Sequence, residues 1–109
     1  MDFKEYQRRA KETAIYPHRG DTITYPTLGL VGEAGEVANV IKKIIRDDNG
    51  EITEERRAVL KKELGDILWY IAQLGTELEL DLDAIARENL DKLASRKKRG
   101  VIFGSGDDR

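Results

Sequence analysis

Two stretches of this chain follow one pattern: LVGEAGEVANVIKKI at residues 30–44 and LKKELGDILWYIAQL at residues 60–74. Placing position 30 on position 60 aligns apolar residues, two acidic residues and a glycine. The matched pairs are Leu30 with Leu60, Glu33 with Glu63, Gly35 with Gly65, Glu36 with Asp66, Val37 with Ile67, Ile41 with Ile71 and Ile44 with Leu74. The repeat predicts two helices of one design, joined by the turn DDNG and related by an approximate two-fold axis.

The whole chain is expected to be an all-α, four-helix bundle-type subunit. Apolar spacing of three and four predicts helices at about 2–14, 27–46, 53–79 and 81–98, followed by a non-helical C-terminal tail at 99–109. Thr53 and Asp81 suit N-cap positions. The loop before the second helix is indicated by Pro17, Gly20 and Pro26. We expect one domain over residues 1–109, since this length supplies one thin core.

Composition limits the classes of function. The chain has 39% hydrophobic and 37% charged residues, a formal net charge of -2 and no cysteine. No global positive field would gather a nucleic-acid polymer or an anionic membrane, and thiolate metal sites and thiol catalysis are excluded. The chain has no apolar run long enough for a membrane span, and its first residues lack the apolar core of a signal peptide. We therefore expect a cytoplasmic protein.

The repeated acidic pairs predict a metal site. Each of these helices is expected to carry a stripe of apolar residues along one face. At about 100° per residue, Glu33 and Glu36 lie along one edge of that stripe, which we call its shoulder. Glu63 and Asp66 lie at the same angles from the stripe of the next helix. The expected stripe on the first of these helices is Leu30, Ala34, Val37, Ile41 and Ile44. Four converging carboxylates repel one another unless a cation neutralises them. Oxygen ligands favour Mg²⁺, with Mn²⁺ possible, over zinc or copper.

Acidic pairs at this spacing also occur on solvated helix faces. Against that alternative stand the matched offsets of the two pairs and the glycines Gly35 and Gly65. A glycine inside a helix costs about 1 kcal/mol relative to alanine, so both positions need a reason such as close backbone approach.

Further polar residues are expected to bind a phosphate chain. Lys43 shares the shoulder of Glu36, and Asn89, Lys92 and Arg96 form a strip on the fourth helix. Carboxylate-held Mg²⁺ with nearby Lys and Arg suits the binding and cleavage of a polyphosphate. The alternative for the strip is a solvated surface or charge matching at the C-terminal end of the helix.

A nucleobase is expected to lie near the loop before the second helix. His18 and Arg19, together with Tyr16 and Tyr25, could cover a base, and Tyr70 on the carboxylate shoulder could stack on it. A plain surface turn is the alternative for the loop.

Three segments resemble the MazG-like nucleoside triphosphate pyrophosphohydrolases of the all-α NTP pyrophosphatase superfamily: LGLVGEAGEV, ELGDILWY and NLDKLASRKKRG, at residues 28–37, 63–70 and 89–100. The hallmark of that family, E-x-x-E followed after a spacer by E-x-x-D, occurs as Glu33-x-x-Glu36 and Glu63-x-x-Asp66. The resemblance covers about residues 25–99.

The resemblance implies Mg²⁺-dependent hydrolysis of a (d)NTP between the α- and β-phosphates, giving (d)NMP and pyrophosphate, in nucleotide-pool house-cleaning. The metal ligands and catalytic residues would be Glu33, Glu36, Glu63 and Asp66, and the phosphate-binding residues would be Lys43, Asn89, Lys92 and Arg96. One carboxylate would orient or deprotonate a metal-activated water aimed at the α-phosphorus.

Three other functions stay open at this point. A phosphoribosyl-ATP pyrophosphohydrolase would share the chemistry with another substrate, and a non-catalytic helical interaction module would need none of the acids. A diiron carboxylate bundle expects Glu-x-x-His pairs, whereas the only histidine here is His18, in a loop.

The thin core, and the family's usual assembly, predict a homodimer or homotetramer with an active site completed across a subunit boundary. Trp69 and Ala72, on the far side of the third helix, are expected to form oligomer contacts. In the tail, Val101, Ile102 and Phe103 are expected to dock on the bundle or on a neighbouring subunit, with a frayed terminus as the alternative.

Overall fold

The computed structural model describes residues 1–109 and confirms the all-α fold with four helices. The helices are α1 (Phe3–Ala10), extended by the 3-10 turn η1 (Lys11–Thr13), α2 (Thr24–Asp47), α3 (Glu54–Glu77) and α4 (Leu82–Arg99). The α-helical part of the first helix ends at Ala10, earlier than expected, with η1 continuing it, and α2 begins at Thr24, earlier than expected, so that it includes Pro26. Proline is tolerated in a first helical turn because the N–H that it lacks would have no helical partner there.

Local signals at the helix ends act as predicted. The side chains of Thr53 and Asp81 cap α3 and α4 by accepting backbone N–H groups, at 3.1 and 2.9 Å. The DDNG turn places Asn49 and Gly50 at φ of 55° and 80°, and Gly100 ends α4 at φ of 73°. All three residues tolerate the left-handed region, so the chain reverses after α2 and stops its last helix there.

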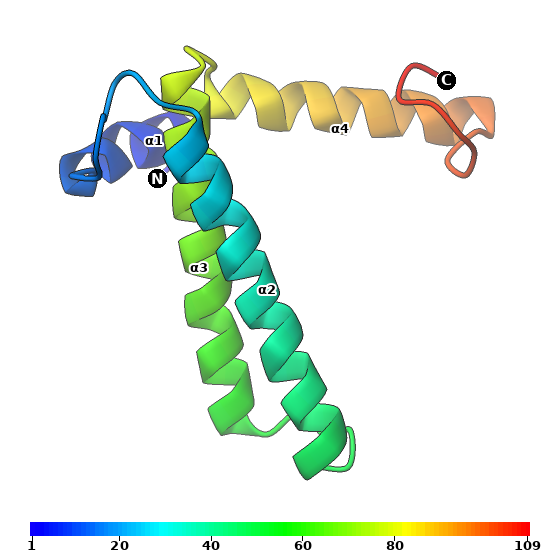
Figure 1. Cartoon of the computed structure of the whole chain (residues 1–109). Coiled ribbons are helices and arrows are strands. Elements are labelled where there is room, and N and C mark those ends of the chain that lie inside the picture. The colour runs from blue at the N-terminus through cyan, green and yellow to red at the C-terminus, as the bar shows by residue number, and fades with distance from the viewer.

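The centre of the molecule is the antiparallel hairpin of α2 and α3 (Figure 1). One set of buried and half-buried positions on each helix follows alternating steps of four and three residues, the spacing of a coiled-coil seam. On α2 they are Pro26, Leu30, Glu33, Val37, Val40 and Ile44, and on α3 they are Arg56, Leu60, Glu63, Ile67, Tyr70, Leu74 and Glu77. The expected stripe through Ala34 and Ile41 is therefore wrong. Those two residues are exposed, and Glu33 and Val40 take their places in the α2–α3 seam.

The other side of α3 is covered by α1, which crosses its C-terminal half (Figure 1). A small core forms there from Ala10, Ala72 and Leu82. Trp69 packs against this core and donates its indole N–H to Thr13 at 2.9 Å. Ala72 is fully buried by its own chain, so an oligomer contact of Ala72 is excluded. Trp69 is only half-buried, and its expected oligomer contact stays a prediction.

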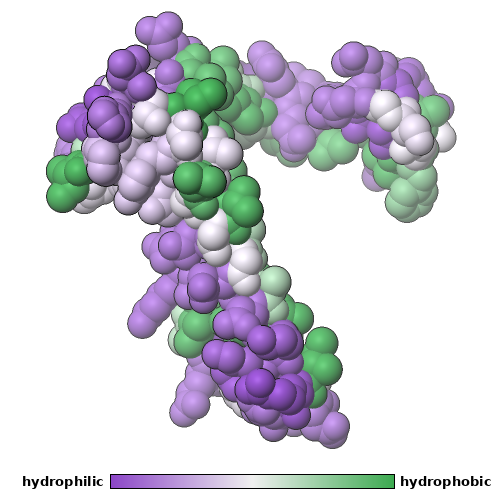
Figure 2. Space-filling model, viewed as in Figure 1, coloured by the Kyte–Doolittle hydropathy of each residue, from purple (hydrophilic) through white to green (hydrophobic).

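Helix α4 runs away from the hairpin instead of packing along it (Figure 1). The apolar spacing of α4 predicts that Leu82, Ala86, Leu90 and Leu93 face inward. Leu82 is buried and Ala86 is half-buried, but Leu90 and Leu93 are exposed. Figure 2 shows apolar surface along the hairpin and at the outer end of α4. No helix in the structure combines the length and the apolar character that crossing a bilayer requires.

The tail folds back on the C-terminal half of α4, but through polar contacts. Asp107 pairs with Lys92 and Arg96, and the Arg109 guanidinium donates to the carbonyls of Val101, Ile102 and Gly106. Phe103 is 95% exposed and Ile102 is also exposed. The tail thus contacts α4 of its own chain without using Ile102 and Phe103, so their expected docking within the chain is wrong. Their docking on a neighbouring subunit stays a prediction.

Close backbone approach is found at a different glycine from those expected. A Cβ added at Gly35 or Gly65 would meet nothing within 4 Å, so these positions are open in the single chain. At Gly29, by contrast, an added Cβ would overlap the ring of Tyr70. The contact of α2 with α3 beside Tyr70 therefore depends on Gly29.

Candidate metal centre and nucleotide site

Three carboxylates meet across the α2–α3 seam. One carboxylate oxygen from each of Glu33, Glu63 and Asp66 lies within 4.8 Å of the others. Glu33 and Glu63 are half-buried at seam positions, and Asp66 is exposed beside them. We call these three residues the carboxylate cluster. The helical spacing of the repeat, combined with antiparallel pairing, is what places the acids of two separate helices side by side.

The cluster is electrostatically costly when no cation is present. Burial raises the pKa of Glu33, and a shared hydrogen bond with Glu63 and the charges of Asp66, Glu63 and Glu36 raise it further. Glu36 is exposed one turn along α2 and is outside the cluster, although its charge reaches Glu33. The structure thus brings together three of the four predicted acids and leaves Glu36 at their edge.

Tyr70 lies beside the cluster, on the same side of α3. Burial raises the pKa of Tyr70, as do the neighbouring Tyr25 and the charges of Glu33 and Asp66. Its ring meets Trp69 edge to face, with centroids 5.1 Å apart, while Tyr16 stacks on Tyr25 at 5.0 Å. A cavity of about 240 Å³ opens among these rings, and its lining is Thr13, Ile15, Tyr16, Pro17, Tyr25, Trp69 and Tyr70. An aromatic cavity next to a carboxylate cluster offers π-faces to a flat ring.

His18 is placed differently from Tyr70. It is exposed, has a φ of 60° and lines neither this aromatic cavity nor the cluster. The conformation of the loop is held instead by Glu77, a residue that the sequence patterns did not single out. The Glu77 carboxylate accepts the Tyr16 hydroxyl at 2.5 Å and the backbone N–H groups of Gly20 and Thr22 at 2.9 and 3.5 Å.

The predicted phosphate-binding residues do not converge on the cluster within one chain. Lys43 is half-buried near the turn end of α2, whereas Asn89, Lys92 and Arg96 lie on the projecting helix α4 (Figure 1). Lys92 and Arg96 are both within 3.1 Å of the Asp107 carboxylate. Arg96 is 5% exposed, and its Nε is buried without a hydrogen-bond partner.

The acidic pattern that builds this site also occurs in known proteins. Residues 22–101 match a family model described as MazG nucleotide pyrophosphohydrolase domain. This chain belongs to the MazG family. The Gene 37 protein of Mycobacterium phage L5 is 55% identical, in a match that covers 95% of this chain and 96% of that protein. No solved structure matches the chain.

MazG domains are generally dependent on divalent metals, and the residues of the cluster fit such an ion. All three ligands are carboxylates, which suit hard cations, and they are close enough to share one. None of Glu33, Glu63 and Asp66 forms an ion pair with a cationic side chain, so the protein itself leaves their negative charges without compensation. A divalent cation would supply that compensation.

Tyr6 of α1 lies near the carboxylate cluster and was also not indicated by the sequence patterns. Burial raises the pKa of Tyr6, and the charge of Asp66 raises it further. In sequence, Tyr6 is an ordinary apolar-face residue of the first helix. Only the crossing of α1 over α3 brings its hydroxyl toward the acids.

Proposed function

We propose that this MazG domain hydrolyses (d)NTPs to (d)NMPs and pyrophosphate with Mg²⁺, and that it serves in nucleotide-pool house-cleaning. The observation that carries the proposal is the convergence of Glu33, Glu63 and Asp66, all members of the family's acidic motif, beside an aromatic cavity. A cation held by the cluster would attract the phosphate chain, and the aromatic cavity suits the base.

In this proposal Glu33, Glu36, Glu63 and Asp66 hold the metal, for which Mn²⁺ could replace Mg²⁺. A bound divalent cation supplies positive charge to the phosphate oxygens and lowers the pKa of an attacking water. A carboxylate oxygen of the same four residues accepts the proton of the water that attacks the α-phosphorus. Tyr70, next to Glu33 and Asp66, orients the substrate by stacking on its base. His18 covers the base only after movement of its loop.

The active site is completed by a second subunit. Asn89, Lys92 and Arg96 are held on a helix that leaves its own hairpin, and exposed apolar residues lie along that helix. In a homodimer or homotetramer, α4 of one subunit can lie against the hairpin of another and bring these residues to the phosphates. Lys43 reaches the same phosphates from α2.

The reaction is tested with a panel of standard and modified (d)NTPs and phosphoribosyl-ATP in the presence of Mg²⁺. We expect a (d)NTP to give pyrophosphate and the nucleoside monophosphate, with no activity after chelation of the metal. Release of orthophosphate alone would contradict cleavage at the α-phosphorus. Preference for phosphoribosyl-ATP would replace the proposed substrate class.

The role of the cluster is tested with Glu63→Gln and with Glu51→Gln as an exposed control outside the site. Since losing even an outer partner of a metal ligand costs about 10- to 100-fold in activity or metal affinity, a lost ligand should cost at least about 100-fold. Circular dichroism should show that both variants keep the helical fold. Full activity in Glu63→Gln would exclude the proposed mechanism.

A further inference from the structure

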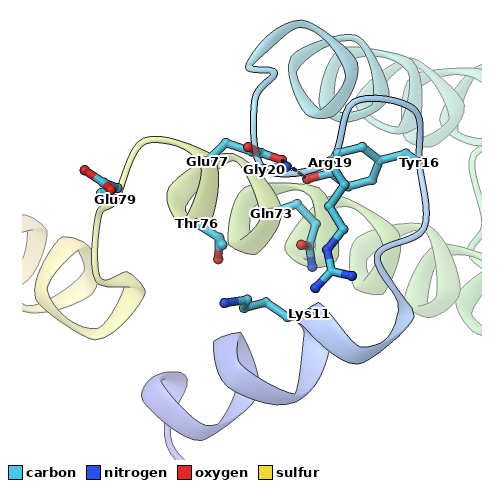
Figure 3. Close-up of a pocket in the computed structure, with 8 residues that line it drawn as sticks. All are labelled: Lys11, Tyr16, Arg19, Gly20, Gln73, Thr76, Glu77 and Glu79. Atoms are coloured by element: carbon cyan, nitrogen blue, oxygen red, sulfur yellow. Dashed lines mark hydrogen bonds between the residues drawn. The ribbon is translucent and has the colours of Figure 1, made fainter.

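A second cavity, of about 290 Å³, lies at the end of α3 away from the DDNG turn (Figure 3). It is enclosed by η1, by the loop around Arg19 and by the last turns of α3. None of the four acids of the MazG motif lines it. The lining residues are Lys11, Tyr16, Arg19, Gly20, Gln73, Thr76, Glu77 and Glu79. We call this space the polar cavity.

The free groups of the polar cavity are hydrogen-bond donors. Neither Lys11 nor Arg19 takes part in any of the ion pairs of the structure. The Thr76 hydroxyl accepts from Gln7 at 3.2 Å, which leaves its own proton free to be donated. In Figure 3, Gln73 and Thr76 point from α3 toward Lys11, with the Arg19 guanidinium beside Gln73.

Gln73 is the unusual member of this set. Its side chain is 1% exposed, and its Nε2 has no hydrogen-bond partner. Leaving a buried amide unpartnered is costly, and almost all buried polar groups in folded proteins are paired. The side chain of Gln73 therefore indicates a missing acceptor in the polar cavity.

The acidic residues of the lining do not supply that acceptor. The Glu77 carboxylate is already occupied by Tyr16, Gly20 and Thr22. Glu79 points away from the other lining residues in Figure 3. The groups of the polar cavity that lack a partner are thus two cations, an amide and a hydroxyl, and all of them can donate hydrogen bonds.

We propose that the polar cavity binds a phosphate oxyanion between Lys11 and Arg19, with Gln73 and Thr76 as neutral donors. Charge-assisted contacts from Lys and Arg are the strong ones at such a site. The volume of about 290 Å³ equals that of several waters at about 30 Å³ each, so phosphate fits with its hydration or with an attached group. The phosphate comes from inorganic phosphate or pyrophosphate, or from a nucleoside monophosphate. This site is separate from the carboxylate cluster.

Binding is tested with the full chain in EDTA at constant ionic strength, so that no metal can link phosphate to the carboxylate cluster. Inorganic phosphate, pyrophosphate and AMP are titrated separately and followed by calorimetry and by amide NMR shifts. We expect saturable binding that moves the signals of residues 11, 19, 73 and 76, and a melting temperature that rises with ligand concentration. Tighter binding of AMP identifies a monoester ligand, and tighter binding of the inorganic anions identifies a free phosphate. Absence of saturable binding by all three would overturn the proposal.

Variants separate a ligand site from a structural feature. Lys11→Met and Arg19→Gln should each weaken binding about tenfold or more, while Lys61→Met, an exposed charge-matched control, should not. Gln73→Met removes an unpartnered amide, so it should raise the melting temperature of the free protein and still weaken binding. Binding that is unchanged in Lys11→Met, Arg19→Gln and Gln73→Met would reject the site. Glu63→Gln should bind phosphate normally, whatever its effect on turnover.

Discussion

Glu33 and Glu63 occupy seam positions that a pair of packed helices would normally fill with leucine or valine. They are half-buried next to Asp66, and the pKa of Glu33 is raised by burial and by these neighbours. Two half-buried carboxylates in contact cost the hairpin stability unless positive charge is added. The same arrangement concentrates negative charge at one point of a chain with a formal net charge of only -2. The site is thus a local feature and owes nothing to overall charge.

Glu77 is a residue whose effect on stability can be measured directly. Burial alone would raise the pKa of Glu77, but hydrogen bonds from Tyr16, Gly20 and Thr22 outweigh it, and the pKa is lowered. Glu77→Gln should reduce the free energy of unfolding by about 1–3 kcal/mol at neutral pH, because it removes a charged acceptor. The Tyr16 hydroxyl remains a donor throughout, since burial and Glu77 raise its pKa to about 12.

The sign of the pH dependence follows from the lowered pKa of Glu77. Its stabilisation is complete above the unfolded-state pKa of about 4.3 and is lost as the pH falls through the lower folded-state value. The difference in the free energy of unfolding between wild type and Glu77→Gln should therefore shrink as the pH falls from about 5 toward 3. Urea unfolding at a fixed protein concentration measures it, with Glu51→Gln as the exposed control. A difference that stays constant over this range would contradict the assigned role.

At the scale of the elements, the hairpin depends on a contact between a glycine and an aromatic ring. Tyr70 lies against Gly29, where no side chain can be accommodated, and the same tyrosine borders the carboxylate cluster. The register of α2 against α3 is thereby linked to the position of a proposed substrate-binding residue. The mid-helix glycines Gly35 and Gly65 have no such neighbour in the single chain.

Alanine substitutions at two glycines of α2 should have opposite effects on stability. In Gly29→Ala the Cβ overlaps Tyr70, and overpacking of about 1–3 kcal/mol should exceed the gain of about 1 kcal/mol in helix propensity. Gly32→Ala meets nothing within 4 Å and should stabilise the helix by up to about 1 kcal/mol.

Thermal melts and steady-state kinetics measure both glycine variants. Gly29→Ala should also raise the KM for the nucleotide, because Tyr70 is displaced from the cluster. Equal melting temperatures for Gly29→Ala and Gly32→Ala would show that the Tyr70 ring moves aside without cost.

At the scale of the whole molecule, the single chain is open. The hairpin, α1 and the loop between η1 and α2 pack together, while α4 and the tail form a separate arm (Figure 1). The arm carries exposed Leu90, Leu93 and Phe103, the last 95% exposed, and the hairpin exposes Leu28, Val31 and Ile45. Apolar surfaces of this extent on two separate parts of one chain favour association between chains.

We therefore predict that the protein is a homodimer or homotetramer and that Leu90→Glu dissociates it. Leu90 is 67% exposed in the single chain, so the substitution should leave the helices intact and act through the interface. Because Lys92 and Arg96 would then no longer reach the phosphates of a nucleotide bound to a partner subunit, nucleotide turnover should fall at least about tenfold.

Light scattering at micromolar concentration and circular dichroism measure the assembly and the helical content. Glu88→Gln, an exposed residue of the same helix, serves as the control and should change neither mass nor turnover. A wild-type protein that is monomeric under these conditions would refute the assembly.

The sequence by itself determined the number of helices, their approximate bounds, the repeated acidic motif and, through that motif, the family. Helix periods, N-caps such as Thr53 and Asp81 and left-handed residues such as Gly50 act within about four residues along the chain, so they can be read locally. The position of Tyr70 beside the acids also followed from the α3 periodicity, since it lies seven residues after Glu63. Local rules suffice for features of this kind.

Only the tertiary structure decided which stripe of each helix packs and where α4 points. On α2 the stripe through Ala34 and Ile41 and the stripe through Glu33 and Val40 are only about 100° apart, and both satisfy the helical period. The choice between them depends on a partner 30 residues away in sequence. The same long-range packing left Glu36 outside the carboxylate cluster and turned Trp69 toward α1. It also formed the polar cavity around Gln73 from segments about 60 residues apart, a distance over which no periodicity in the sequence carries information.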